Sequence, residues 1–150
     1  MLVIETVVKP SKISGMGLFT SQDIPKGTVV WEYDPNFAFL VNKKQLQILE
    51  KSTKQTDLVR FILIYGFYVK ALDSIILDLD NGRFINHSFQ PSLGLAEVAP
   101  EEKWRYSVAL RDIAKGEELT EDYRSFEVSS WSRQFISKYQ VFDVFSKSFI

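Results

Sequence analysis

The chain has 150 residues, a length typical of one folded domain, and 45% of them are hydrophobic, including twelve Phe, six Tyr and three Trp. Lys and Arg number 18 and Asp and Glu number 19, so the formal charge of −1 creates no basic field that would favour nucleic acid as the main ligand. The absence of cysteine excludes disulfides, thiolate metal sites and cysteine nucleophiles.

The first residues and the hydropathy pattern predict a soluble, intracellular protein. Residues 1–9 lack the basic start and apolar run of a signal peptide. No stretch reaches the roughly 18 apolar residues that a membrane-spanning helix needs. No repeat, low-complexity tract or linker divides the chain, so we expect a single domain over residues 1–150.

Strands are expected in the N-terminal third and around the middle of the chain. β-Branched residues dominate residues 2–8, and residues 29–31 follow a Pro-Lys-Gly turn, both of which are typical of strands. A further strand is expected over 74–79. It is followed by a tight turn with positive φ at 80–82, and a strand then resumes at Arg83.

Three helices are expected. The first lies near 43–51, where Asn42 and a Gln at the third helical position form a capping pattern. Thr56 is expected to cap a second, buried helix, and an amphipathic helix is expected at about 131–149. The second helix has apolar side chains every three or four residues: Leu58, Phe61, Ile62, Tyr65 and Val69. The third has Trp131, Phe135, Tyr139, Phe142, Phe145 and Phe149.

A surface loop and a strand are expected between the second and the third helix. Residues 90–103 include two Pro, a Gly and three Glu, a composition that indicates an exposed loop. The segment 106–110 is expected to be a strand.

Three short segments are candidates for binding and chemistry. In Gly15–Met16–Gly17, two glycines let the backbone approach a ligand closely, although a lone G-x-G is equally typical of an ordinary turn. Asn86–His87, within R-F-I-N-H-S, holds the only histidine; this is also typical of a structural His, and one His without Cys does not make a metal site. The third segment, G-E-E-L-T-E-D-Y, ends at Tyr123 and by itself indicates only an acidic turn before a strand.

In this order the three segments resemble the SET family of protein lysine methyltransferases, and the resemblance covers about residues 7–126. It implies an α+β, mostly β fold of the β-clip type. In that fold a C-terminal pseudoknot threads the segment around Asn86 through a loop of the following chain. We therefore expect a SET core at about 7–126, completed by the C-terminal helix at about 131–149.

The resemblance also implies the site residues. The expected contacts of S-adenosylmethionine are Gly15, Met16, Gly17, Asn86 and His87. Tyr123 is the expected catalytic residue, orienting the lysine amine in a narrow channel whose wall includes Tyr33 and Leu95. Because Leu95 stands where relatives often have Tyr, that channel would lack one hydroxyl. Phe126 or Trp131 is expected to pack against the adenine.

The implied function is transfer of a methyl group from S-adenosylmethionine to a lysine of a protein or peptide, such as a histone. Acidic residues near the channel suit a basic peptide, but they are equally typical of a solvated surface. No metal, nucleic acid or membrane partner is expected, and the oligomeric state stays open. The main alternative is a catalytically inactive SET-like module that binds a peptide or partner. A Ser–His–Asp hydrolase lacks the nucleophile-elbow motif, and a small-molecule methyltransferase would need a doubly wound pattern.

Overall fold

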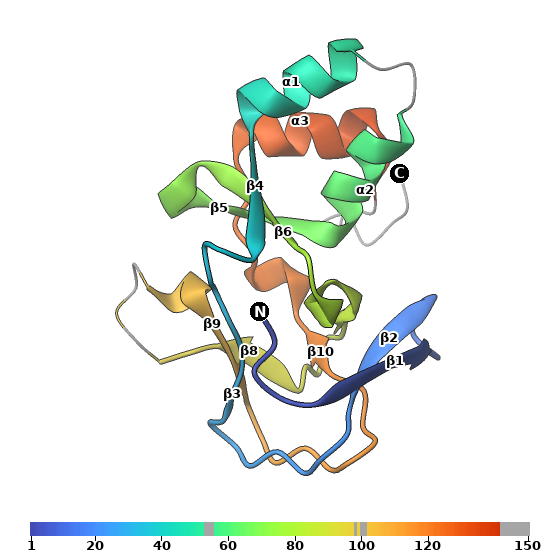
Figure 1. Cartoon of the computed structure of the whole chain (residues 1–150), viewed down its shortest axis with the longest axis vertical. Helices are drawn as coiled ribbons and strands as arrows, with labels where there is room; N and C mark the ends of the chain where they lie inside the picture. The colour runs from blue at the N-terminus through green and yellow to red at the C-terminus, as the bar shows by residue number, and fades with distance from the viewer. Residues whose placement is uncertain (53–55, 98, 100–101, 142–150) are drawn as a thin grey trace. The chain divides into compact units, whose positions relative to one another are not determined.

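A computed structural model describes residues 1–52, 56–97, 99 and 102–141. These residues form two compact units (Figure 1). The first unit contains residues 1–38 and 78–123, and the second contains residues 39–77 and those from 124 onward. Each unit is thus built from two separate stretches of the chain, and these stretches alternate in sequence.

The first unit consists of short sheets. β1 (Thr6–Pro10) pairs antiparallel with β2 (Met16–Thr20). A three-stranded antiparallel sheet has the order β3 (Val29–Glu32), β9 (Tyr106–Ala109), β8 (Leu93–Leu95). β7 (Asn86–His87) and β10 (Thr120–Glu121) form a parallel pair. Three short 3-10 helices lie at Asn81–Phe84, Lys103–Arg105 and, at the edge of the unit, Tyr123–Ser125.

One apolar core holds these short sheets together. Its buried side chains come from β2, β3, β8, β9 and the segments between the elements: Leu18, Ile24, Val30, Ile85, Leu93, Ala109, Ile113 and Leu119. Burying one Leu or Ile completely contributes roughly 1.5–3 kcal/mol. Because Leu18, Ile85 and Leu119 each adjoin one of the three motif segments, this core fixes the backbone of all three.

The second unit contains the helices and a three-stranded sheet (Figure 1). The sheet has the order β4 (Ala38–Asn42), β6 (Ser74–Asp78), β5 (Gly66–Val69). The helices are α1 (Lys43–Ser52), α2 (Asp57–Tyr65) and α3 (Ser130–Lys138), with a 3-10 turn at Lys70–Leu72. Their core is formed by Val41, Leu46, Val59, Ile62, Leu63, Ile75, Leu77, Trp131, Phe135 and Val141.

The start of α1 confirms the predicted cap. The backbone N–H of Gln45 donates to Asn42 Oδ1 at 3.0 Å, and the N–H of Asn42 donates to Gln45 Oε1 at 2.8 Å. Two helix N-terminal donors that would otherwise lack partners are satisfied reciprocally. Local sequence was sufficient here because both partners lie within one turn.

The second helix differs from its prediction in its face and its end. It buries Val59, Ile62 and Leu63, whereas Leu58 and Phe61 are 48% and 41% exposed. The helix is apolar on nearly all sides, so spacing alone could not identify the buried stripe. Thr56 occupies the N-cap position, but its side chain makes no capping hydrogen bond.

The predicted continuation of this helix to Val69 is wrong, because the chain becomes extended at Gly66 and forms β5. A Cβ at position 66 would lie 2.7 Å from the carbonyl oxygen of Ile62 and would also overlap Ile75. Gly66 therefore permits the close approach of helix and strand. The apolar periodicity continued past this point because β5 is itself apolar.

The predicted tight turn with positive φ at 80–82 is also wrong. Residues 81–84 form a 3-10 helix, and the Asp80 carboxylate caps it by accepting the Gly82 N–H at 2.8 Å. Gly82 does not adopt positive φ; a Cβ there would lie 3.0 Å from Asp80 and 3.2 Å from Trp31. The glycine is needed for space, and the next strand starts at Asn86 instead of Arg83.

The helix that begins at Ser130 has a capping box formed by Ser129 and Ser132. It ends at Lys138, earlier than the expected 149, and Gln140 then adopts a left-handed φ of 52°. Trp131 and Phe135 are buried as the aromatic stripe predicts. Tyr139 is partly buried against the same core. The remaining predicted positions, Phe142, Phe145 and Phe149, lie outside the described residues.

Most of the other strand predictions hold. Ser74–Asp78 and Tyr106–Ala109 are strands. The exposed loop expected at 90–103 is wrong in part, because it contains the short strand β8, in which Leu93 is completely buried. The first strand starts at Thr6, and Leu2 forms only an isolated bridge with Trp31. Within the part of the chain that the structure describes, no helix is long and apolar enough to cross a bilayer.

Candidate functional site

Two of the three motif segments meet through the parallel pair β7 and β10. Asn86 lies opposite Thr120, and His87 lies opposite Glu121. The pairing is extended by the N–H of Ser88, which donates to the carbonyl of Glu121 at 2.9 Å. Segments more than thirty residues apart are thus joined, and this brings His87 next to Tyr123.

The side-chain amide of Asn86 connects these strands to the glycine-rich segment. Its Nδ2 donates to the carbonyls of Met16 at 3.1 Å and Ser14 at 3.2 Å. It also donates to Glu118 Oε1 at 2.8 Å. An amide has only two N–H donors and one carbonyl oxygen. Since the donors are directed at protein acceptors, Oδ1 is the atom that Asn86 can offer to a ligand.

The two glycines of the first segment have different roles. Gly15 has a positive φ of 47°, and no atom lies within 4 Å of the position that a Cβ would take. At Gly17, in contrast, a Cβ would overlap the carboxylate of Glu118. Gly15 therefore leaves space at which a ligand can approach the backbone, while Gly17 makes room for a side chain of the protein itself. Met16, between them, is 42% exposed.

His87 is held by the backbone of the third segment. The N–H of Tyr123 donates to His87 Nδ1 at 3.2 Å, and Asp122 Oδ1 lies 3.9 Å from the same nitrogen. A ring nitrogen that accepts this bond carries a lone pair, so the neutral ring has its proton on Nε2. The ring of Phe89 packs edge-on against the imidazole with centroids 4.6 Å apart.

Tyr123 is partly buried, and its hydroxyl donates to the carbonyl of Ile85. Removal from water is the main cause that raises the pKa of Tyr123 above its ordinary value, and the nearby Glu121 raises it further. The phenol therefore keeps its proton. This geometry suits a fixed, orienting hydroxyl and is unfavourable for a phenolate base.

Glu121 is a second carboxylic acid close to Tyr123, and sequence reasoning treated it only as part of an acidic surface. Ser107 Oγ donates to its carboxylate, and removal from water raises the pKa of Glu121. Burial also raises the pKa of Asp78 to about 7, with further increases from Asp80 and Glu121. In β10, Thr120 is buried and the carboxylate of Glu121 reaches Ser107 on β9, a contact that no pattern in the sequence indicated.

The proposed channel residues Tyr33 and Leu95 lie on the sheet of β3, β9 and β8. Leu95 pairs with Ser107 on β9, and Trp31 pairs with the same residue from the other side. The N–H of Tyr33 donates to the carbonyl of Arg105 at 2.8 Å. Leu95 is 40% exposed. Through Ser107, this sheet is connected to Glu121 and hence to the segment of Tyr123.

The two candidates for adenine packing, Phe126 and Trp131, belong to the second unit. The ring of Phe126 stacks on Phe67 with centroids 5.5 Å apart and an interplanar angle of 28°. Trp131 is buried, and its Nε1 donates to Asp73 at 2.9 Å, so we assign it to the core of this unit. The role of Phe126 towards a cofactor stays a prediction.

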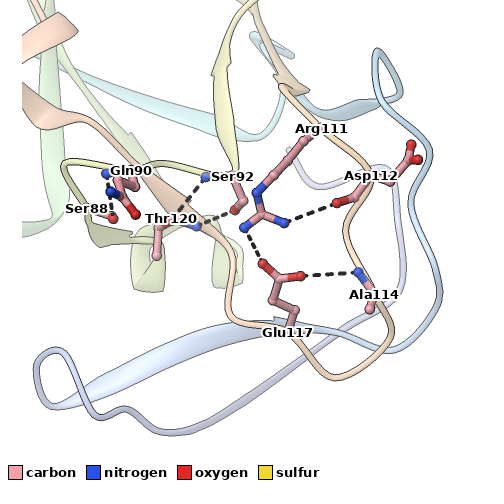
Figure 2. A network of polar contacts seen from close by, with 8 residues as sticks. All are labelled: Ser88, Gln90, Ser92, Arg111, Asp112, Ala114, Glu117 and Thr120. Carbon is pink, nitrogen blue, oxygen red and sulfur yellow. Dashed lines mark hydrogen bonds and ion pairs between the residues drawn. The ribbon is translucent and has the colours of Figure 1, made fainter.

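Buried polar contacts hold the backbone on which the site is built (Figure 2). Ser92 and Thr120 exchange hydrogen bonds: the N–H of Ser92 donates to Thr120 Oγ1 at 3.2 Å, and the N–H of Thr120 donates to Ser92 Oγ at 3.0 Å. Both residues are buried, so these bonds satisfy groups that water does not reach. The ion pair of Arg111 and Glu117 closes the turn before β10.

Comparison with known proteins gives one consistent result. A family model described as SET domain matches residues 15–124. The chain is 31% identical over 130 residues to the Drosophila melanogaster protein named Histone-lysine N-methyltransferase trr, with 83% of this chain and 5% of that protein covered. It is 33% identical over 118 residues to the human Histone-lysine N-methyltransferase 2D, with 76% of this chain and 2% of that protein covered. The chain thus spans only a small part of these relatives.

A solved structure agrees with the sequence relatives. The Neurospora SET domain protein DIM-5, a histone lysine methyltransferase, superposes with a TM-score of 0.55 and 20% identity, covering 86% of this chain and 55% of that one. At this identity the likeness concerns the fold. It agrees with the small sheets and few helices described above, and the predicted mostly β, α+β fold is confirmed.

Proposed function

The chain belongs to the SET-domain family, and on that premise we propose that it is a protein lysine N-methyltransferase that uses S-adenosylmethionine. The observation that carries the proposal is the joining of the three motif segments within one unit. Asn86 binds the carbonyl of Met16, and His87 binds the backbone of Tyr123. The names of the relatives, which are histone-lysine methyltransferases, support the same reaction.

The described residues fit a cofactor with both an amino acid end and a nucleoside end. Asn86 offers a fixed carbonyl oxygen, which suits an ammonium group, and the backbone at Gly15 is open to close approach. We propose that Gly15, Met16, Gly17, Asn86 and His87 hold S-adenosylmethionine, with Gly17 acting through the room it leaves for Glu118. Phe126 is proposed to pack on the adenine. The bound cofactor would supply a methyl group activated by a positively charged sulfur.

The residues of the chain itself have to orient a lysine amine and favour its neutral form. An exposed lysine has a pKa near 10.4, and a site of low polarity lowers it because the charged form is disfavoured. We propose that Tyr33, Leu95 and Tyr123 line such a channel. The Tyr123 hydroxyl, fixed on Ile85, would orient the amine without removing its proton.

The proposed substrate is a lysine in a basic protein segment such as a histone tail. The relatives support this choice by name, and Asp122 puts an acidic group next to Tyr123. A histone substrate would require the protein to reach chromatin, and we propose a nuclear role on that ground. The number of methyl groups added depends on the width of the channel at Leu95.

The proposal is tested by incubating the chain with isotopically labelled S-adenosylmethionine and a panel of histones, followed by mass spectrometry of the products. Label on a lysine side chain is the expected result. An Asn86→Ala protein serves as the control with an impaired cofactor site. Cofactor binding in a calorimetric titration without any transfer would instead identify an inactive partner-binding module, and absence of cofactor binding would overturn the assignment.

A further inference from the structure

The carboxylate of Glu118 is in contact with two of the motif segments at once, although nothing in the sequence marked it as a site residue. Ser11 Oγ lies 2.7 Å from Oε1 and 2.9 Å from Oε2 of Glu118, and Asn86 Nδ2 donates to Oε1 at 2.8 Å. The same carboxylate occupies the space beside Gly17. Ser11, Gly17 and Asn86 therefore surround one acidic side chain.

The backbone around Glu118 is fixed as firmly as its side chain. Glu118 forms a bridge with Phe19 of β2, and the N–H of Leu119 donates to the carbonyl of Leu18 at 2.8 Å. Leu119 itself is completely buried. The carboxylate is thus attached to a rigid backbone and oriented by Ser11, an arrangement that can position another group accurately.

This arrangement decides which way the Asn86 amide points. In the observed orientation, Nδ2 faces three acceptors: the carbonyls of Ser14 and Met16 and the carboxylate of Glu118. If the amide were turned by 180°, Oδ1 would face the same three oxygens and repel them. The carboxylate carries the largest charge of the three, so it contributes most to the preference.

We propose that Glu118 is a positioning residue of the cofactor site, which holds the Asn86 amide so that Oδ1 is presented to the ligand. The identity of that ligand rests on the function proposed above. Glu118 would act on binding only through Asn86. Its removal would allow the amide to rotate and would weaken the binding of a ligand that needs an acceptor at this point.

The test is a double-mutant cycle on the affinity for S-adenosylmethionine, measured by calorimetry. Glu118→Ala should weaken binding by about fivefold or more, a typical size for residues coupled through one network. In an Asn86→Ala background, the same change should alter the affinity by less than about twofold. If Glu118→Ala leaves the affinity of the native protein unchanged, or if the two effects multiply in the double variant, the proposal is wrong.

Glu117→Ala is the matched control. Glu117 is the neighbouring glutamate, and its partner is Arg111 in place of Asn86. Its replacement should lower stability by losing the ion pair but leave cofactor affinity within about twofold of the native value. An equal loss of affinity in both variants would show that any damage to this turn weakens binding, which would overturn a specific role for Glu118.

A second measurement decides the inference even if the chain does not bind S-adenosylmethionine. The side-chain NH₂ resonances of Asn86, identified by their disappearance in Asn86→Ala, should shift and broaden in the ligand-free Glu118→Ala protein. Unchanged resonances would contradict the proposal. If Glu118→Ala does not fold, Glu118→Gln keeps the size of the side chain and should show the same changes to a smaller degree, since a Gln amide can also donate to a rotated Asn86.

Discussion

The backbone N–H of Tyr123 donates a hydrogen bond to Nδ1 of His87, joining residues 36 positions apart in the sequence. The imidazole therefore acts as an acceptor that fixes the backbone of the residue proposed for catalysis. The orientation of the Tyr123 backbone therefore depends on an acceptor being present at position 87.

Replacement of His87 by Ala should loosen the backbone at Tyr123, because its N–H loses its acceptor. Loss of one partner of a partly buried hydrogen bond costs about 1–3 kcal/mol. His87→Asn keeps an acceptor at a similar distance from the backbone and should recover part of the loss. Denaturant unfolding of the two variants measures the difference, and equal stabilities would show that the acceptor is unimportant.

Replacement of Asn86 by Ala should weaken binding of S-adenosylmethionine by roughly fivefold to 150-fold, the range that corresponds to about 1–3 kcal/mol. The cause is the loss of the oriented Oδ1 and of the bonds to Met16 and Glu118. Circular dichroism must first show that the variant is folded. A native dissociation constant in the folded variant would remove Asn86 from the cofactor site.

The fold was predictable because the three motif segments, in their order, resemble the SET family, and the resemblance implied the fold. The cap of α1 by Asn42 and Gln45 was predictable because both partners lie within one helical turn. The cap depends on geometry within one helical turn, and the motif segments are residue patterns that few folds require.

The roles of Glu118 and Glu121 could not be read from the sequence. A glutamate in an acidic run is usually solvated, and only the three-dimensional arrangement shows that Ser11 and Asn86 surround Glu118 while Ser107 binds Glu121. The prediction of which face of α2 is buried was wrong for a related reason. When apolar residues surround a helix, the neighbouring elements decide which side is buried.

The stability of the protein should fall as the pH rises from about 5 to 8, in part because of Asp78. Burial raises the pKa of Asp78 to about 7, and the neighbouring Asp80 and Glu121 add to the increase, while the amino terminus and Trp31 oppose it. The folded chain then binds a proton that the unfolded chain has released above about pH 4. The proton on Asp78 therefore contributes its full stabilisation below about pH 4, and this stabilisation is lost as the pH rises through about 7.

Asp78→Asn tests this pH dependence, since Asn keeps the shape but does not ionise. Each pKa unit corresponds to about 1.4 kcal/mol, and we expect the native chain to lose about 1–3 kcal/mol more than the variant between pH 5 and pH 8. Chemical denaturation at both values gives the comparison. Parallel pH profiles of the two proteins would show that Asp78 ionises normally in the folded chain.

Trp131→Ala should destabilise the second unit by about 3–5 kcal/mol, the usual cost of removing a large buried aromatic side chain. Trp131 packs edge-on against Tyr68 at 5.5 Å, and its Nε1 bonds the carboxylate of Asp73. Thermal unfolding measures the effect. Arg133→Ala, on the same helix, offers a milder control because Arg133 is exposed. Equal melting temperatures for the two variants would show that α3 contributes little to the core.

Tyr123→Phe should separate binding from chemistry. The change keeps the aromatic wall but removes the hydroxyl that donates to Ile85, so cofactor affinity should remain within about twofold while methyl transfer falls. Removing one preorganised polar group from a reacting site commonly costs on the order of 3 kcal/mol, which is about a hundredfold in turnover. A changed ratio of mono-, di- and trimethylated product is expected for the same reason, because the oxygen no longer limits how the amine can turn.

Tyr139→Phe is the matched control for this experiment. The Tyr139 hydroxyl is also hydrogen-bonded, to Glu50 at 2.6 Å, but the residue packs against the core of the second unit. This substitution should alter stability and leave the transfer rate per folded molecule close to native. The two variants are compared by initial rates with a peptide substrate and by mass spectra of the products. If Tyr123→Phe transfers methyl groups at the native rate and gives the same products, Tyr123 is a packing residue, and the reacting lysine must be oriented by other groups.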